Sequence, residues 1–396
     1  MIAVLALFLL IGHGFHLLGH YRRCLDGYVR LAATASSIRS NAVSVIIPAR
    51  NEARDLGKTI ESLQRQQGVT LEVLIVDDHS MDETATIAQR HAALDSRVRA
   101  LSAPTLPDGW CGKPHAQAYG ASIATHPLLL FADADVRFAP AALASAVEEL
   151  ERRRVDLVTL IPATELGSFW ERAVQPVMAA VIFYGVSFTR VNDPADPQSM
   201  GVGAFLLVRR STYDAAGGHQ AIRDRIVDDY ALADSVKRAG GKLWLADGGD
   251  LLSIRMYHSF AELWRGWSKN LYEGLRLPVR FRMGRRERVI VNDRPLVVLG
   301  LLCGFLVSTF ILPIAMPIWV TLTPTHPAVS LTTYGVSAVF VVAWTSLCRR
   351  LGMGRVWAVA LPLGALVVAA IALHSTWRAR LGGGLLWRGR QYRARR

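Results

Sequence analysis

The chain has 396 residues, of which 51% are hydrophobic and 19% charged, and its formal net charge is +13. This length allows two or three domains, and the apolar content is high for a soluble protein. Four cysteines with neither metal-ligand nor disulfide spacing argue against a structural zinc site and fit a reducing cytoplasm. Much of the positive charge flanks apolar runs, which indicates an anionic lipid surface and not nucleic acid.

The apolar residues are concentrated near the two ends of the chain. Residues 1–20 are predicted to form an N-terminal transmembrane anchor. A cleaved signal peptide is the alternative, but Arg22 and Arg23 follow the apolar run instead of preceding it, and no small-residue cleavage site stands out. Residues 295–376 hold three further runs, of which the first exceeds the roughly 20 residues that span a bilayer and the other two are about that length. These runs are Pro295–Leu322, Val329–Leu347 and Val356–His374.

Arginines beside the apolar runs predict the topology. The positive-inside rule places the chain after the first anchor in the cytoplasm. Seven arginines between Arg276 and Arg294 hold the end of the soluble region on the same side. Three full C-terminal spans would place the basic tail, residues 377–396, outside, although this tail carries seven arginines and no acid. We therefore expect one C-terminal segment to be re-entrant or interfacial, and the alternative is a tail that departs from the positive-inside rule.

Between these regions, residues 40–290 have the pattern of a soluble α/β domain. Short apolar runs alternate with helical patterns of 11 to 14 residues, which predicts a doubly wound, mostly parallel sheet. Asp55 and Asp82 stand where they could cap the first two helices. The predicted elements, in chain order, are a strand over Val43–Ile47, a helix over Asp55–Gln67, a strand over Leu71–Val76, a helix over Asp82–Ala93, a short strand near Val98, a helix over Pro114–Thr125, a strand over Pro127–Phe131 and a helix over Pro140–Arg153.

Two carboxylates, Asp133 and Asp135, follow the strand that ends at Phe131. Ligands of open α/β sheets bind beyond the carboxyl ends of the strands. Two adjacent acids repel each other unless a hard cation neutralises them, and Mg²⁺ or Mn²⁺ held there can bridge a nucleotide diphosphate. An ordinary acidic turn is the alternative.

Polar residues also follow the first two predicted strands. The first strand leads into Pro48–Glu52, and the second leads into Asp77 and Asp78. In a parallel sheet these ends lie at one edge, so the carboxylates converge on one crevice. A helix cap explains any one of these acids alone, but it does not explain all of them together.

A second acidic pair, Asp228 and Asp229, opens a predicted helix that runs to Arg238. The helix dipole favours acids in the first turn and keeps them charged. The alternatives are that Asp228 caps the helix and that Asp229 is a solvated first-turn acid.

Taken in order, these motifs resemble those of a family 2 glycosyltransferase with the nucleotide-diphospho-sugar fold called GT-A. The resemblance covers about residues 42 to 275. Gly109-Trp110-Cys111-Gly112-Lys113 is also similar to a Gly-Trp-x-Gly-Lys signature of a bacterial membrane branch associated with hopanoid and carotenoid lipids. The matching motifs are Val45–Glu52, Val76–Thr84, Asp133–Asp135 and Val227–Ala233.

The resemblance implies a donor site for a nucleotide-diphosphate sugar. Asp77 or Asp78 would bind the base, Asp133 would face the ribose and diphosphate, and Asp135 would be the main ligand of Mg²⁺ or Mn²⁺, with Asp133 beside it. Lys113 would contact the diphosphate, although a surface lysine would look the same in the sequence. The residues that would line the nucleotide pocket are Pro48, Ala49 and Glu52.

The resemblance further implies an inverting displacement. Asp229 would be the general base, with Asp228 in place of the family's usual Glu. The segment around Trp264, Arg265 and Trp267 keeps a tryptophan but lacks the motif spacing of processive relatives, which favours transfer of a single sugar. We expect this segment to be a helix in the membrane interface that presents the acceptor, and ordinary core packing is the alternative.

The sequence thus predicts a bacterial inner-membrane glycosyltransferase with a cytoplasmic catalytic domain. It would move one sugar to a lipid, such as a polyisoprenoid, hopanoid or carotenoid. A polyprenyl-phosphate sugar transferase is the alternative among enzymes. A catalytically inactive membrane scaffold or lipid-transport helper is the alternative outside them. No nucleic-acid partner is expected.

Overall fold

The structure is a computed structural model. It describes residues 7, 11–16, 19, 27–34, 42–277, 279–283, 286–290, 294–380, 385–387 and 390–392, with backbone alone for 279–290 and 385–392. Most of the predicted anchor (1–20) and much of the basic tail (377–396) lie outside the described residues. The last described helix extends beyond the predicted end of the membrane region at residue 376, to Arg380.

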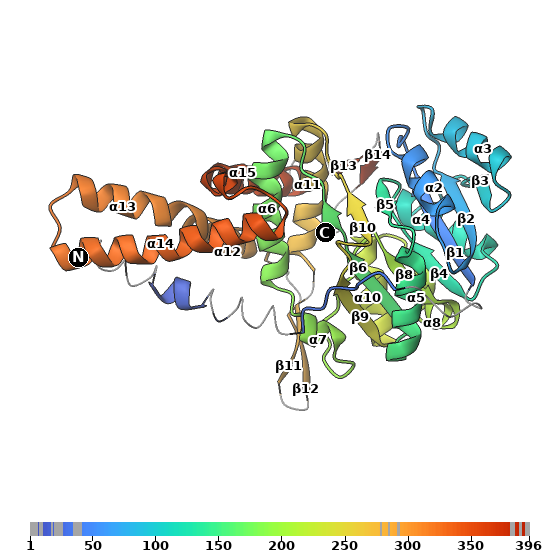
Figure 1. Ribbon diagram of the computed structural model, residues 1–396, viewed down its shortest axis with the longest axis horizontal. Coiled ribbons are helices and arrows are strands. Elements are labelled where there is room, and N and C mark those ends of the chain that lie inside the picture. Colours follow the sequence, from blue (N-terminus) through green and yellow to red (C-terminus); the bar gives the residue numbers. More distant parts are fainter. Residues whose placement is uncertain are drawn as a thin grey trace.

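A seven-stranded sheet organises the domain, with strand order β3-β2-β1-β4-β8-β6-β9 (Figure 1). The first four of these strands are parallel, as predicted. β8 runs antiparallel between β4 and β6, so the sheet is mixed. The strands are β1 (Ala42–Ala49), β2 (Thr70–Asp77), β3 (Val98–Ser102), β4 (Leu128–Phe131), β6 (Leu157–Ile161), β8 (Leu206–Arg209) and β9 (Leu243–Asp247).

Helices cover both faces of this sheet because successive side chains of a buried strand point to opposite sides. In β1, Val45 and Ile47 pack with α2 (Leu56–Gln64), α3 (Thr84–Leu94) and α5 (Ala142–Arg153). Ile46 faces the other layer. That layer holds α4 (Gly112–Ile123), α8 (Arg210–Ala215), α9 (Gly218–Ala221) and α10 (Asp228–Arg238).

Strand register brings the predicted motifs to one edge. Ala49 pairs with Asp77, and Ile46 pairs with Phe131. The segments that follow β1, β2 and β4 therefore leave the sheet side by side. A small second sheet lies beside this edge and is built from β5 (Val136–Phe138), β10 (Leu252–Ile254) and β7 (Ala163–Thr164).

The two predicted caps behave differently. Asp82 stands one residue before Glu83, the N-cap of α3, and accepts a hydrogen bond from the Thr84 amide at 3.0 Å. Asp55 makes no side-chain cap bond to α2, so that prediction is wrong. Its carboxylate accepts a hydrogen bond from the Arg137 guanidinium at 2.6 Å, and a charge-assisted bond of this kind is stronger than a cap.

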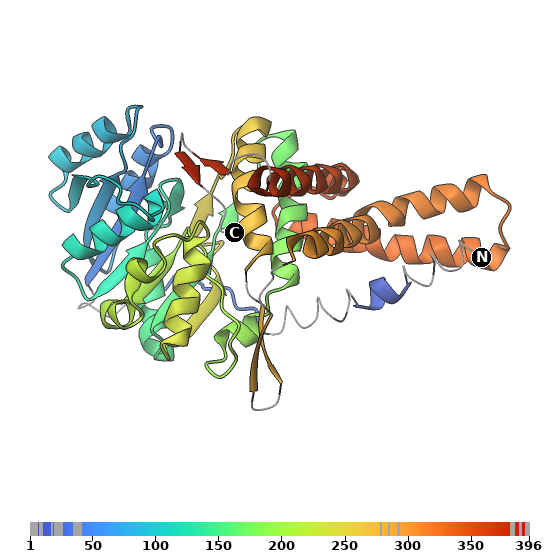
Figure 2. The same ribbon diagram turned by 180° about the vertical axis from the view of Figure 1, so that it is seen from behind.

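Two long helices, α6 (Phe169–Tyr184) and α11 (Phe260–Leu275), lie between the sheet domain and the pair of helices α13 (Leu312–Leu322) and α14 (Pro327–Arg350) that projects from the molecule (Figures 1 and 2). α6 is followed by the short α7 (Phe188–Asn192), and α11 stands beside α6. The backbone hairpin β11–β12 (Val279–Met283 and Arg286–Ile290) follows α11. A second backbone hairpin, β13–β14 (Leu385–Trp387 and Arg390–Tyr392), follows the last helix.

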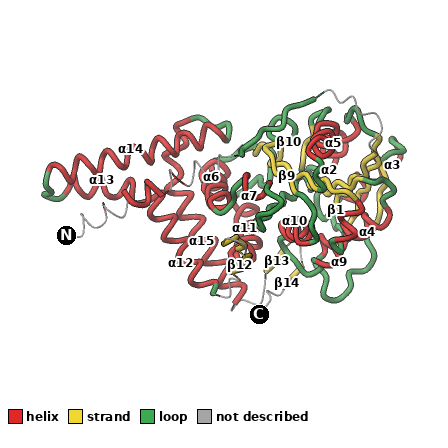
Figure 3. The backbone as a smooth tube through the Cα atoms, turned by 90° about the horizontal axis from the view of Figure 1, so that it is seen from below, coloured by secondary structure: helices red, strands yellow, loops and turns green. Residues whose placement is uncertain are grey.

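Three helical runs in the described part of the chain are long and apolar enough to cross a membrane: Pro295–Leu322, Pro327–Arg350 and Arg355–Arg380. The first comprises α12 (Pro295–Leu306), the π-helical η1 (Val307–Ile311) and α13 (Leu312–Leu322). α14 (Pro327–Arg350) returns alongside α13, as Figure 3 shows from below. The third comprises η2 (Arg355–Ala360) and α15 (Leu361–Arg380).

α15 packs on α6 and α11. Small residues permit this close approach, since a Cβ added to Gly364 would lie 1.9 Å from the Ala173 carbonyl oxygen. Buried apolar side chains from the three helices form one cluster there. These include Val174 and Val177 of α6, Leu263 and Leu271 of α11, and Val368 and Ile371 of α15.

Candidate active site

A cavity of about 730 Å³ collects most of the predicted site residues. One side, the strand-end wall, consists of Pro48, Ala49, Glu52, Asp78, Asp133 and Asp135. The opposite side, the helix wall, consists of Met178, Val181 and Ile182 of α6 and Trp267, Lys269, Asn270, Leu271 and Leu275 of α11. The N-terminus of α10 adds Asp228 and Asp229. Segments distant in sequence therefore meet around one space.

Lys113 links the strand-end wall to α10. Its Nζ lies 2.7 Å from Asp133 Oδ1 and 3.3 Å from Asp228 Oδ2. Burial alone would lower the pKa of Lys113, but the negative charges of Asp133 and Asp228 raise it well above its usual value. The lysine therefore stays charged inside the site.

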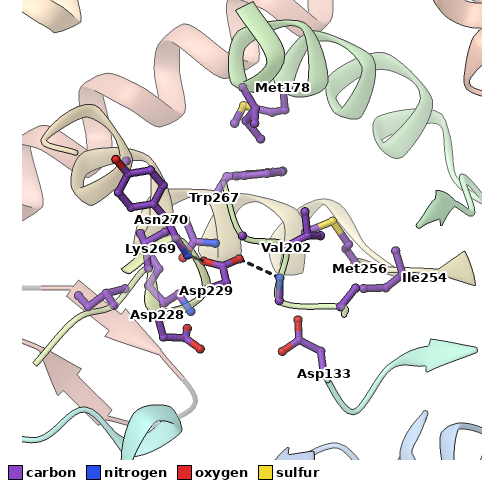
Figure 4. A pocket seen from close by; sticks show the side chains of 18 of the residues that line it. Asp133, Met178, Val202, Asp228, Asp229, Ile254, Met256, Trp267, Lys269 and Asn270 are labelled. Atoms are coloured by element: carbon purple, nitrogen blue, oxygen red, sulfur yellow. Dashed lines mark hydrogen bonds between the residues drawn. The ribbon is translucent and has the colours of Figure 1, made fainter. Parts of the chain in front are cut away.

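Asp229 projects into the cavity from the first turn of α10 (Figure 4). Its Oδ2 accepts a hydrogen bond from the Gly203 amide at 2.9 Å, drawn dashed in the figure. Burial, and then the charge of Asp228, raises the pKa of Asp229 to about 6. An acid of this pKa is ionised at neutral pH and can still accept a proton.

Gly203 allows the carboxylates to gather. It precedes β8, and a Cβ built on it would lie 2.9 Å from Asp133 Oδ2 and 3.4 Å from Asp229 Oδ2. Any larger residue would push into the space between these two acids. The groups that approach Gly203 most closely are therefore side chains of the site itself, among them the carboxylates of Asp133 and Asp229.

Asp135 has the donor chemistry that suits a divalent cation. Burial, and then the charges of Asp133 and Glu52, raises its pKa well above the usual value, because the ionised carboxylate faces other acids. The described residues include no group of three or more His, Cys, Asp or Glu side chains placed to hold a metal alone. Mg²⁺ is commonly held by one or two carboxylates together with substrate phosphates, and Asp133 and Asp135 fit that arrangement.

The loops after β1 and β2 are joined to each other. Asn51 and His79 adopt positive φ values of 54° and 58°, a conformation that Asn and His tolerate better than most residues. The Asn51 amide donates to Ser80 Oγ at 3.0 Å, and its side-chain oxygen accepts from the Met81 amide at 2.8 Å. The loops therefore present a fixed edge to the cavity.

Asp77 and Asp78, which were equal candidates, have different surroundings. Asp78 is buried and lines the cavity. Asp77 does not line it, and its carboxylate accepts a hydrogen bond from the Ser80 amide at 3.3 Å within the loop.

The helix that carries Trp264 and Trp267, α11, is more enclosed than an exposed interfacial helix would be. Trp267 is buried, lines the cavity and donates from Nε1 to Gln175 Oε1 on α6 at 2.8 Å. Trp264 donates to His374 Nδ1 on α15 at 3.1 Å and lies outside the cavity. Arg265 is exposed and also lies outside it. Of these three predicted acceptor residues, only Trp267 therefore reaches the cavity.

Two cavity residues of α11, Lys269 and Asn270, were not predicted as site residues. Both lie beside Asp229 in Figure 4. Burial, and then the positive charge of Lys113, lowers the pKa of Lys269 to about 8. A lysine two residues after Trp267 was the available signal, but the same pattern describes the solvated face of any amphipathic helix.

Comparisons with known proteins agree with this geometry. Residues 44–216 match the family described as Glycosyl transferase family 2. Among solved structures, the mannosyltransferase PcManGT from Pyrobaculum calidifontis, in complex with GDP-Man and Mn²⁺, aligns with a TM-score of 0.55 at 18% identity. The alignment covers 95% of this chain and 99% of that one, and it shows the likeness of fold. Residues 44–216 are therefore similar to family 2 glycosyltransferases, and the chain has the GT-A fold.

Curated relatives include two proteins named 4,4'-diaponeurosporenoate glycosyltransferase. That of Staphylococcus aureus (strain USA300) is 29% identical over 254 residues, which cover 62% of this chain and 64% of the relative. That of Staphylococcus haemolyticus (strain JCSC1435) is 28% identical over 238 residues, which cover 59% and 62%. The match spans less than two thirds of the length of these relatives.

Proposed function

We propose that this protein is a membrane-bound glycosyltransferase that moves one sugar from a nucleotide-diphosphate sugar to a lipid acceptor. The observation that carries the proposal is the cavity, in which the carboxylates of the strand-end wall face the largely apolar helix wall. A polar donor and an apolar acceptor each find a matching surface there. The similarity to family 2 and the glycosyltransferase relatives support the same class of reaction.

The donor would lie along the strand-end wall. Pro48, Ala49 and Glu52 would line the nucleotide pocket. Asp78 would bind the base, because it lines the cavity and Asp77 does not. Lys113 and Asp133 would contact the diphosphate. Asp135, with Asp133, would hold Mg²⁺ or Mn²⁺, which would neutralise charge on the departing diphosphate.

Asp229 would act as the general base, with Asp228 beside it. The acceptor oxygen forms a bond to the anomeric carbon while the bond from that carbon to the diphosphate oxygen breaks. The electron pair leaves with the nucleoside diphosphate, and the proton of an acceptor hydroxyl passes to the Asp229 carboxylate. One such displacement inverts the configuration at the anomeric carbon. The hydrogen bond from the Gly203 amide fixes Asp229 for this task.

The acceptor would enter along the helix wall, past Trp267, and would be a polyisoprenoid such as a hopanoid or carotenoid. The proposed organisation is an anchor at 1–20, a cytoplasmic catalytic domain at 40–290, membrane segments at 295–376 and a basic tail at 377–396, in a bacterial inner membrane. The third apolar run is the most enclosed, with 44% of its most apolar window buried against 33% and 28% for the other two. This enclosure supports an interfacial or re-entrant position for it.

A donor panel tests the proposal. Full-length protein in detergent would be incubated with UDP-, GDP- and dTDP-sugars in Mn²⁺ or in EDTA, and nucleotide release would be measured. We expect release from one donor, dependent on metal and reduced at least about 100-fold by Asp135→Ala. Asp214→Ala, at an exposed acid of α8, serves as the matched control and should behave like the wild type. No turnover and no metal-dependent donor binding would contradict the proposal and favour an inactive scaffold.

A further inference from the structure

Lys269 lies between the acidic part and the apolar part of the cavity lining. On its polar side are Asp228 and Asp229, close enough for their charges to act on the Lys269 ammonium group. On the other side, the next turn of α11 contributes Leu271, Gly274 and Leu275 to the cavity lining. Lys269 thus marks the boundary between the reacting centre and the apolar part of the cavity, and Figure 4 shows it beside Asp229.

Apolar side chains from separate helices line the rest of the cavity. α6 contributes Met178, Val181 and Ile182, and Leu351 lies just beyond the end of α14. The cavity lining thus reaches the end of α14, one of the helices long enough to span a membrane. An apolar chain placed along it would present its head group beside Lys269.

Two cations, Lys113 and Lys269, line the cavity near the reacting centre. Lys113 is 2.7 Å from Asp133 and 3.3 Å from Asp228, on the donor side. Lys269 belongs to the helix wall. Asp228 and Asp229 would repel an anionic head group that approached along the helix wall. A cation on that wall offsets this repulsion, whereas a neutral alcohol would gain little from it.

The position of Lys269 is fixed from behind by α15. Ser375 of α15 is fully buried; its hydroxyl donates to the Ser268 carbonyl and accepts from the Tyr272 amide at 3.2 Å. These two backbone groups belong to the turn of α11 that carries Lys269. His374 Nδ1 lies 3.2 Å from Ser268 Oγ in the same turn. A candidate membrane helix therefore holds the turn that presents the lysine.

We propose that Lys269 binds the anionic group, a carboxylate or a phosphate, at the head of an amphiphilic acceptor and places its oxygen for attack. This inference rests on the proposed function and names its substrate class. The acceptor oxyanion forms the bond to the anomeric carbon as the diphosphate leaves with the electron pair. An ionised acceptor brings no proton, so none has to pass to Asp229.

Three probes with one hydrocarbon chain and different head groups test this: phytanic acid, phytanyl phosphate and phytanol. Binding to full-length protein in detergent is measured without donor, and transfer is measured with the donor that the panel identifies. The variants are Lys269→Met, which removes the charge, and Lys269→Arg, which keeps it. Lys58→Met, at an exposed lysine of α2, is the matched control.

We expect the wild type to bind at least one acidic probe about 10- to 100-fold more tightly than phytanol. Lys269→Met should abolish that difference and raise the acceptor KM by a similar factor, while Lys269→Arg retains most of it and Lys58→Met retains all. The acid that is transferred identifies the head group as carboxylate or phosphate. If Lys269→Met does not fold, Lys269→Gln removes the same charge with a polar side chain.

Two results would overturn the inference. One is equal binding of phytanol and both acids, with no dependence on Lys269. The other is a Lys269→Met variant whose donor KM rises while acceptor binding stays unchanged, because the lysine would then serve the donor. Failure of the proposed function gives a different result, because no nucleotide-sugar donor would then turn over. Binding of the three probes is measured without donor, so it tests the role of Lys269 separately.

Discussion

The two walls of the cavity are built in different ways. The strand-end wall comes from loops directly after β1, β2 and β4, whose positions are fixed by strand register. The helix wall comes from α6 and α11, whose positions depend on contacts with α15. Charge is concentrated on the first wall and apolar surface on the second. A short motif can therefore specify the strand-end wall, the proposed donor side, whereas the helix wall, the proposed acceptor side, requires the packing of distant helices.

The largest effect that separates the two walls is expected from Asp229→Asn. With a hydroxyl acceptor, loss of the general base should lower kcat by about 10²- to 10⁴-fold. With an ionised acceptor the loss should stay below about tenfold, because no proton needs removal. Transfer to phytanol, phytanic acid and phytanyl phosphate measures this. Asp214→Asn, on the exposed side of α8, is the control.

Equal losses with all three acceptors would show that Asp229 positions groups and does not accept a proton. Such a result would leave the donor site intact but would contradict the assigned role of the acid.

A pair of glycine substitutions contrasts the walls directly. Gly203→Ala should reduce kcat by about 10- to 100-fold, because its Cβ would lie 2.9 Å from Asp133 Oδ2 and 3.3 Å from Lys113 Nζ. Gly274→Ala on α11 meets no atom within 4 Å and should be tolerated. As a helix residue it should even raise stability by about 0.5–1 kcal/mol. Steady-state kinetics and thermal unfolding of both variants provide the measurements.

If Gly203→Ala retained full kcat, the carboxylates would have to be less tightly placed than the structure describes. If Gly274→Ala impaired activity as strongly, the apolar end would be as demanding as the polar end, and the contrast between the walls would fail.

The pH dependence of transfer provides a smaller and graded effect. Asp229 has a pKa of about 6, raised by burial and by Asp228, and a general base works only when deprotonated. For a hydroxyl acceptor, kcat/KM should therefore fall about tenfold per pH unit below pH 6 and level off above it. Asp228→Asn removes the neighbouring negative charge, which should lower the pKa of Asp229 and shift the fall of kcat/KM to lower pH. A fall that stays in place in the variant would contradict the coupling of the two acids.

The sequence predicted the strand-end wall well because its chemistry is local. Asp133 follows a strand whose register to β1 is dictated by buried apolar residues, so its neighbours could be named in advance. The sequence did not place β8 antiparallel between β4 and β6, since the order of strands depends on long connections. The roles assigned to individual residues stay predictions until the variants are measured.

The helix wall could not be predicted in the same way. The sequence indicated an amphipathic helix around Trp264 and Trp267 but not which face would reach the cavity. That choice depends on Gln175, 92 residues before Trp267, and on His374, 110 residues after Trp264. Lys269 consequently resembled a solvated lysine. Helical periodicity identifies faces, but only tertiary contacts decide what each face meets.

The smallest predicted effect tests whether α15 truly fixes the helix wall. Ser375→Ala removes the hydroxyl between the Ser268 carbonyl and the Tyr272 amide and should cost about 1 kcal/mol of stability. Because these groups lie in the turn of Lys269, acceptor KM should rise by a few-fold while donor KM does not change. Ser346→Ala, whose hydroxyl bonds only within α14, is the control. A rise in donor KM instead would mean that α15 positions residues of both walls, so the two sides of the cavity would not be independent of each other.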